Sequence, residues 1–267
     1  MLAATIGPDT TELEGRQMER SEYHKLDQLE DRMWWFAASH RNLLTLSWRQ
    51  VLLDAGPILD AGCGTGGFLA QLAALYPNRA LFGLDVNPLA CERAAVKSAR
   101  PVCVGSINAL PFPEGVFAAV FGIDVLCHSA VDERSAVLQF RRCLADNGCL
   151  VVNVPAYNWM LSRHDAAVHN VRRYTEKGVR RLLESAGFRM VYATYWNAVL
   201  FPLMVITRKF LPKRGSATSD VKEYPRLIDL LCRVATTFET TLFRRGLRLP
   251  FGSSVIMIAT KGDAALG

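Results

Sequence analysis

A glycine-rich segment near residue 60 stands between a predicted strand and a predicted helix. Residues 59–67 read Leu-Asp-Ala-Gly-Cys-Gly-Thr-Gly-Gly. Glycines allow a tight turn and let backbone amides approach a ligand closely. The spacing of Gly62, Gly64 and Gly67 satisfies the G-x-G-x-x-G pattern of dinucleotide sites. The glycines therefore predict a nucleotide-type cofactor but do not identify it.

Two carboxylates flank this loop and narrow the choice of cofactor. Asp60 ends the strand before the loop, where it suits a ligand that carries an ammonium and a sulfonium and would repel a pyrophosphate. Asp85 ends the next predicted strand, and its carboxylate can accept hydrogen bonds from both hydroxyls of a ribose, which suits a dinucleotide as well as another nucleoside cofactor. Val86 follows Asp85, and residues 105–113 follow the third predicted strand. Both are therefore expected at the edge of the sheet that the carboxyl ends of the strands form.

These motifs resemble those of the bacterial class I methyltransferases of the type 11 group, which use S-adenosylmethionine (SAM). That group carries D-x-G-C-G-T-G, an acid ending strand two, G-D-A-x-x-L-P-F and D-V-L-x-H, and here the last is Asp124 to His128. The similarity includes Trp-Trp-Phe at residues 34–36 and a later His-Asp and Arg-Arg-Tyr-Thr stretch. It implies SAM as cofactor. The cofactor site it implies contains Asp60, Gly62, Cys63, Gly64, Gly66, Asp85, Val86, Ser106, Ile107 and Asp124.

One position departs from the pattern of this group. The group commonly has an aspartate that accepts from the adenine amino group, and this chain has Ser106 there. We expect backbone groups of Ser106 and Ile107 to hold the adenine, with the serine hydroxyl as a weaker acceptor. Asp124 could approach the methyl-transfer site, or it could cap a loop.

Side chains with acid–base or anion-binding chemistry follow the fifth predicted strand. His164 or His169 could act as a base near neutral pH, and Asp165 could orient His164. Arg172 and Arg173 could hold a phosphate or carboxylate. A surface loop whose histidines and arginines cap neighbouring helices is the alternative interpretation. We expect no metal, because no third ligand lies at a standard spacing.

Two further groups could line the acceptor side. His128 follows the fourth predicted strand, where it could act as a base or pack as a hydrogen-bonded residue. The aromatic residues 34–36 could line an acceptor pocket, although packing of a helix onto the sheet is the commoner use of such side chains. The predicted catalytic residues are therefore His164, Arg173 and His128.

Alternating strands and helices from residue 57 predict a doubly wound, mostly parallel, seven-stranded Rossmann-like α/β sheet. We divide the chain into an N-terminal helical cap (1–54), a SAM-binding core (55–197), a helical insertion between strands six and seven (198–252), and the final strand with the tail (253–267). Residues 18–29 are expected to be helical. Gly148 is expected to close a helix over residues 132–145 as a left-handed cap.

The long connection between strands six and seven has a composition of its own. An apolar segment at residues 199–210 precedes a basic and polar linker at 212–220 and an amphipathic helix at about 227–245. The basic residues beside the apolar segment are Arg208, Lys209, Lys213 and Arg214. This segment could cover the acceptor site as a lid, the interpretation we favour, or touch a membrane surface or lipid-linked substrate.

Composition sets broad limits on location and partners. The chain has 267 residues, a net charge of +6 and 50% hydrophobic residues, which favours a packed core and anionic partners. Its seven cysteines are scattered and form no C-x-x-C, as expected of reduced thiols in the cytoplasm. The first ten residues show no signal-peptide pattern.

Together these features predict a SAM-dependent methyltransferase acting on a small-molecule acceptor. The acceptor could be lipid-like or glycan-related, and anionic or amphipathic. We expect no nucleic-acid substrate, because neither N-P-P-Y nor D-P-P-Y follows strand four. A SAM-binding protein without methyl transfer and an NAD-dependent oxidoreductase are the alternatives. The oligomeric state stays open.

Overall fold

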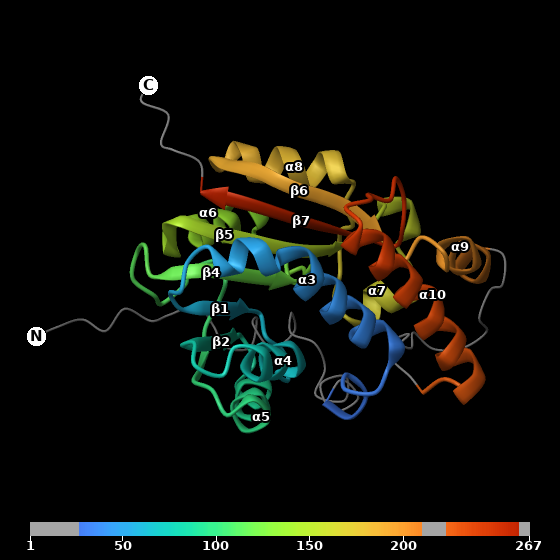
Figure 1. Cartoon of the computed structure of the whole chain (residues 1–267), viewed down its shortest axis with the longest axis horizontal. Helices are drawn as coiled ribbons and strands as arrows, with labels where there is room; N and C mark the ends of the chain where they lie inside the picture. Colours follow the sequence, from blue (N-terminus) through green and yellow to red (C-terminus); the bar gives the residue numbers. More distant parts are fainter. Residues whose placement is uncertain (1–26, 210–222, 262–267) are drawn as a thin grey trace, which may run out of the picture.

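A computed structural model describes residues 27–209 and 223–261. Its centre is a seven-stranded sheet in the order β3-β2-β1-β4-β5-β7-β6 (Figure 1). The strands are β1 (Ile58–Ala61), β2 (Leu81–Asp85), β3 (Val102–Val104), β4 (Phe117–Ile123), β5 (Leu144–Pro155), β6 (Phe188–Trp196) and β7 (Ser254–Lys261). All neighbours are parallel except β7, which is antiparallel to both β5 and β6. The predicted doubly wound, mostly parallel sheet is confirmed.

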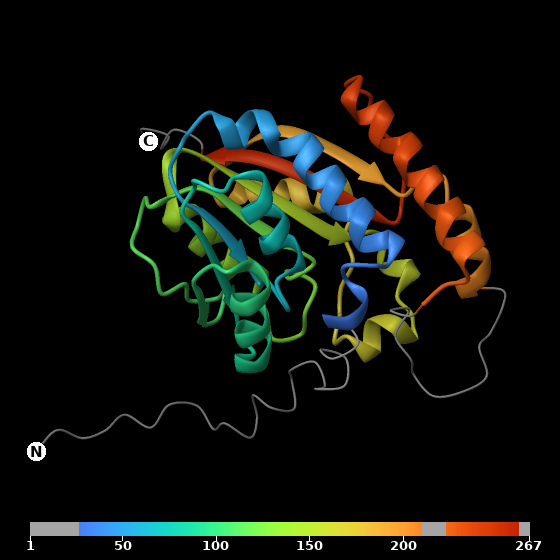
Figure 2. The same cartoon turned by 60° about the horizontal axis from the view of Figure 1, so that its bottom comes forward.

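Helices cover both faces of this sheet, as Figure 2 shows from a second direction. Alternate strand residues feed two separate cores. Val120 and Val152 face the core shared with α6 and α8, whereas Phe121 and Val151 face the core shared with α3 and α4. The helices are α3 (Trp34–Leu52), α4 (Gly67–Leu75), α5 (Pro88–Ser98), α6 (Glu133–Cys143), α7 (Arg163–Ala167), α8 (Glu176–Ser185), α9 (Phe201–Lys209) and α10 (Arg226–Arg244). Strands buried on both faces explain the continuous apolar runs in the sequence.

Several helix ends follow from local side-chain chemistry. The Asn87 side chain accepts hydrogen bonds from the amides of Leu89 and Ala90, and Pro88 occupies the first turn of α5. Thr175 caps α8 and accepts from the Gly178 amide at 3.1 Å.

The prediction for Gly148 is wrong. The helix ends earlier, at Cys143, and the chain passes directly into β5 through extended Leu144. Gly148 is not among the residues with positive φ. A Cβ at this position would lie 2.9 Å from the carbonyl oxygens of Phe117 and Ala145. Glycine is therefore needed here for the close approach of two backbones.

The insertion between β6 and β7 contains α9 and α10, and α10 packs along α3 (Figures 1 and 2). Within the described ranges, no helix combines the length and apolar character needed to cross a bilayer. The predicted linker at residues 212–220 lies outside the described residues, as does most of the helix expected at 18–29. The four-part division of the chain remains a prediction.

Candidate functional site

The turn from β1 into α4 is shaped by glycines in the left-handed region. Gly62, Gly64 and Gly66 have φ values of 84°, 53° and 91°. A Cβ on Gly62 would lie 2.1 Å from Cγ1 of Val125, and one on Gly66 would lie 2.6 Å from Cα of Ala94. Both conformation and space thus exclude other residues at these two positions. The loop lies at the carboxyl ends of the parallel strands, where ligands of doubly wound folds bind.

Asp60 is a buried carboxylate with an unused acceptor. The residue is 1% exposed, and its Oδ2 has no hydrogen-bond partner among the described residues. Burial, with smaller contributions from the nearby charges of Asp85 and Glu30, raises the pKa of Asp60 to about 8. A buried carboxylate without a partner costs free energy unless a cation or a donor meets it. Asp60 therefore favours a ligand that brings positive charge to the base of the loop.

Asp85 joins the end of β2 to the glycine loop. Its Oδ2 accepts from the Gly64 amide at 2.9 Å, and its Oδ1 accepts from the Asn87 amide at 3.0 Å. Burial raises the pKa of Asp85, and these amide hydrogen bonds oppose the rise. Each carboxylate oxygen keeps a second lone pair for a ligand hydroxyl. The next residue, Val86, is 41% exposed, so it can offer an apolar contact at the same edge.

The segment after β3 is a tight turn. The Ser106 hydroxyl accepts from the Asn108 amide at 3.2 Å, so one of its acceptor positions serves the turn. Ile107 is 6% exposed and belongs to the core that contains Leu84. Residues 106 and 107 can therefore offer a ligand their backbone groups and the remaining hydrogen-bonding capacity of the Ser106 hydroxyl.

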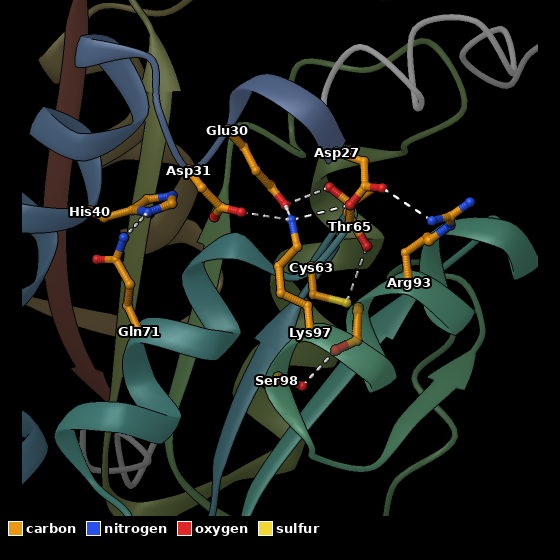
Figure 3. Close-up of polar contacts among 12 residues, drawn as sticks. Asp27, Glu30, Asp31, His40, Cys63, Thr65, Gln71, Arg93, Lys97 and Ser98 are labelled. Carbon is orange, nitrogen blue, oxygen red and sulfur yellow. Dashed lines mark hydrogen bonds and ion pairs between the residues drawn. The ribbon is translucent and has the colours of Figure 1, made fainter.

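Figure 3 shows a cluster of acids and bases that ties the residues before α3 to the loop. Glu30 is 6% exposed, accepts from the Thr65 hydroxyl at 2.7 Å and pairs with Lys97 of α5. Lys97 also lies 3.2 Å from Asp27 and 3.3 Å from Asp31. Through the hydrogen bond between Thr65 and Glu30, the cluster connects the residues before α3 to the glycine loop. Sequence reasoning missed Glu30 and Lys97, because no local pattern connects residues 67 positions apart.

Asp124 follows β4 in an unusual backbone conformation, with φ at 53°. Its two carboxylate oxygens lie 3.0 and 3.1 Å from the Asn153 side-chain nitrogen. Burial raises the pKa of Asp124 to about 7, opposed by the Asn153 hydrogen bond and the charge of Arg173. Such a pKa suits a group that exchanges protons near neutrality, and strained non-glycine residues concentrate at functional sites.

Asn153 is a second residue that sequence reasoning missed. It is fully buried in β5, and its Oδ1 accepts from the Trp196 indole at 2.8 Å. That hydrogen bond fixes the orientation of the amide, which then presents its nitrogen to Asp124. A polar residue inside the apolar run of residues 149–155 was the available signal.

His128 follows Asp124 by four positions, in the loop between β4 and α6. Burial lowers the pKa of His128 to about 4, with a smaller contribution from His169, so its ring is neutral at pH 7. The structure therefore gives His128 the environment of a packed, hydrogen-bonded histidine. A group with this pKa is a weak base.

The predicted acceptor cluster is built around a buried ion pair. The Arg173 guanidinium binds Asp165 Oδ1 through Nε and Nη2, both at 2.8 Å, and is itself 6% exposed. The other oxygen of Asp165 accepts from the Ser162 amide at 2.8 Å and from the Ser162 hydroxyl at 2.9 Å. Both oxygens of Asp165 thus hold Arg173 and the start of α7, the helix that carries His164.

A cavity of roughly 470 Å³ lies beside this ion pair. Arg172 lines it and pairs with Glu133 at 3.6 Å, while the Tyr174 hydroxyl donates to Glu133 at 2.6 Å. Tyr157 and the half-exposed Trp159 stack at the rim with ring centres 5.7 Å apart. The cavity combines aromatic side chains with an arginine that is paired to the acid Glu133.

The aromatic residues at the start of α3 belong to the core. Trp34 is 8% exposed, and the Trp35 ring lies 5.3 Å from that of Trp196 on β6. Phe36 lies 5.4 Å from Trp35 in an edge-on arrangement. Packing of the N-terminal helix onto the sheet, the commoner of the two uses, accounts for these contacts.

Residues 58–148 match the family described as a methyltransferase domain. The chain is 33% identical over 98 residues to a malonyl-acyl-carrier protein O-methyltransferase of Legionella pneumophila, a match that covers 35% of this chain and 34% of that protein. An enzyme of the same name from Geobacter sulfurreducens is 30% identical over 155 residues, covering 52% and 58%. The chain thus spans less than two thirds of either relative.

Among solved structures, geranyl diphosphate C-methyltransferase from Streptomyces coelicolor A3(2) has a similar fold. The TM-score is 0.54 at 12% identity, and the match covers 77% of this chain and 69% of that one. At such low identity, the similarity concerns the fold alone.

Proposed function

Because residues 58–148 belong to the methyltransferase domain family, within a class I SAM-dependent methyltransferase fold, we propose that this protein transfers a methyl group from SAM to a small-molecule acceptor. The observation that carries the proposal is the unpaired carboxylate of Asp60 beneath the glycine loop. SAM carries positive charge on its sulfonium and its ammonium, whereas a dinucleotide would bring a pyrophosphate toward Asp60, Asp85 and Glu30. Electrostatics therefore favours SAM over NAD.

Each part of SAM has a suitable group at this edge of the sheet. Asp60 would meet the amino-acid end, together with backbone groups of the loop formed by Gly62, Cys63, Gly64 and Gly66. Asp85 would accept the ribose hydroxyls. Val86, Ser106 and Ile107 would contact the adenine, and Asp124 would lie toward the reacting end. When bound, SAM supplies an activated methyl group, so the chain's part is to orient the acceptor and exclude water.

The predicted catalytic residues take different parts in this proposal. His164 is proposed as a base on α7. Arg173, bound to Asp165, is proposed to position α7 and the residues around it. His128 is proposed to shape the pocket, because a pKa of about 4 leaves it a weak base. Asp124 joins them as a second candidate base, since its pKa of about 7 suits proton removal from an acceptor hydroxyl.

The acceptor is proposed to be amphipathic and anionic. The cavity beside Tyr157 and Trp159 offers aromatic surface, and its lining includes two arginines, Arg172 and Arg173, against one acid, Glu133. Arginine binds carboxylates and phosphates well. The apolar α9, which begins just after β6, is proposed to act as a lid over this acceptor.

Calorimetry with SAM, S-adenosylhomocysteine and NAD tests the cofactor assignment. We expect the first two to bind and NAD to fail. Incubation with methyl-labelled SAM and fractionated small-molecule extracts then tests transfer. Tight NAD binding without SAM binding would overturn the proposal. SAM binding without any labelled product across the fractions would limit the protein to cofactor binding.

A further inference from the structure

Helix α10 presents its polar side to the protein. Thr240 accepts from Arg41 of α3 at 3.0 Å and donates to Asn42 at 2.6 Å. Thr236 accepts from Arg41 at 3.3 Å. Asp229 accepts from the Trp34 amide at 3.2 Å, at the start of α3. These hydrogen bonds run along α3 and fix the rotation of α10 about its own axis.

A buried carboxylate fixes the same helix to the end of β6. Glu239 is fully buried and accepts from the amides of Asn197 at 2.6 Å and Val199 at 2.8 Å. Few apolar side chains of α10 face inward; Phe243, near the end of the helix, is 4% exposed. The inner side of α10 is thus held mainly by directional polar contacts.

The opposite side of α10 is an outward-facing apolar stripe. Five large apolar side chains recur there at helical spacing, each between 56 and 68% exposed. They are Leu227, Leu230, Leu231, Val234 and Phe238. We call them the α10 stripe. An amphipathic helix on a water-exposed surface normally buries its apolar side, so α10 has the reverse orientation. Apolar patches of this kind mark interaction surfaces.

The charged side chains that α10 itself exposes are both arginines, and the exposed acid Glu223 precedes the helix. The two acids within α10, Asp229 and Glu239, both lie on the inner side. Arg226 begins the helix and Arg244 ends it, and both are exposed. The surface around the α10 stripe therefore offers apolar side chains with cationic groups at both ends, and the acids of this helix do not offset them.

The neighbouring helix α9 continues this character. Leu203 is 59% exposed and Ile206 is 49% exposed, and Lys209 is exposed at the end of the helix. Both views place α9 and α10 at the same end of the molecule (Figures 1 and 2). Two helices thus present apolar and basic side chains there.

We propose that the α10 stripe docks onto an anionic lipid surface, with α10 lying in the plane of the headgroups. Apolar side chains insert into the boundary between headgroups and acyl chains, while arginines bind the anionic headgroups. A negatively charged bilayer matches both properties of the surface. Because α10 is part of the insertion between β6 and β7, such docking would hold the insertion at the membrane.

Vesicle co-sedimentation of the full chain tests this proposal. The probes are vesicles of phosphatidylcholine alone and vesicles in which about one third of the lipid is phosphatidylglycerol. We expect binding to the anionic vesicles, weakened by salt. The double variant Leu231→Glu, Val234→Glu should bind at least tenfold more weakly, since two buried apolar groups are lost. The double variant Arg226→Gln, Arg244→Gln should lose about fivefold per arginine.

Val96→Glu is the matched control. Val96 is 81% exposed on α5, away from α10, so this variant should bind like the unchanged chain (Figure 1). Equal binding by the stripe variant and the control would overturn the proposal, as would failure of the unchanged chain to bind. If the chain forms a dimer in solution and the stripe variant dissociates it, the α10 stripe binds a second copy of the chain instead. A lower melting temperature of the stripe variant would assign it to the chain's own packing. The assay needs no SAM, so its outcome is separate from that of the proposed function.

Discussion

We predict that SAM binds more tightly as pH rises toward 8, because the buried carboxylate of Asp60 must ionise to meet a cation. In the free protein, burial raises the pKa of Asp60 to about 8, so most molecules carry it protonated at pH 7. A positive ligand favours the ionised form and lowers this pKa. Binding at neutral pH should then release a proton from Asp60.

The size of the effect follows from the ionised fraction. With a pKa of about 8, roughly 1% of Asp60 is ionised at pH 6 and about a quarter at pH 7.5. If SAM requires the ionised form, its affinity should rise about twentyfold over this range, close to 1.8 kcal/mol. Calorimetry at several pH values, repeated in buffers of different ionisation enthalpy, measures both the affinity and the proton release.

Asp60→Asn is the matched control, because it keeps the shape of the side chain and cannot ionise. SAM has a titrating amino group of its own, whose contribution is the same in both proteins and cancels in the ratio of their affinities. That ratio should grow with pH. The same variant reports on stability: a raised carboxyl pKa means that Asp60 costs the folded state free energy as pH rises from about 4 to 8. A ratio of affinities that stays constant from pH 6 to 7.5 would refute the reasoning.

Three further predictions concern the rest of the site. Asp85→Ala should weaken SAM binding tens-fold in calorimetry, since it loses two hydrogen bonds worth about 2–4 kcal/mol together; unchanged affinity would remove Asp85 from the ribose site. Asn153→Leu deletes a hydrogen bond that lowers the pKa of Asp124. The acid limb of the pH profile of kcat/KM should therefore move upward from about 7. An unmoved limb would exclude Asp124 as the base. Arg173→Met leaves Asp165 buried without its ion-pair partner, so urea denaturation should show a free energy of unfolding lower by about 3–5 kcal/mol. Normal stability together with a raised KM for the acceptor would instead indicate that Arg173 binds the substrate.

Much of the fold could be predicted because its signals are local. Apolar runs indicate the buried strands, and local residues such as the cap Thr175 and the first-turn Pro88 are typical of helix starts. The loop of residues 59–67 and Asp85 were predicted to lie at one edge for the same reason, since adjacent parallel strands bring their carboxyl ends together, and the structure places them side by side there. Gly148 misled because a glycine after a helix serves either a left-handed cap or a close backbone contact, and sequence does not separate the two.

The remaining parts of the site depend on long-range contacts. Glu30 reaches Thr65 across 35 positions, and Asp124 meets Asn153 across 29. Asp165 and Arg173 are only eight positions apart, and here the sequence pointed to chemistry where the structure shows a buried ion pair. Arg173 is buried and its guanidinium is bound to Asp165, and sequence alone does not show whether an arginine is buried or exposed. Periodicity alone could not show that α10 turns its apolar side outward.

The position of β7 has a consequence for how the chain is made. β7 lies between β5 and β6, although it follows both in the chain, and among the described strands β6 pairs with β7 alone. Roughly 57 residues separate the end of β6 from the start of β7, which ribosomes translate in about 3 to 11 seconds. During that interval β7 has not been synthesised, so neither edge of β6 has a strand to pair with. Vectorial synthesis thus exposes an unpaired strand, and this interval is when a chaperone would protect the chain most from aggregation.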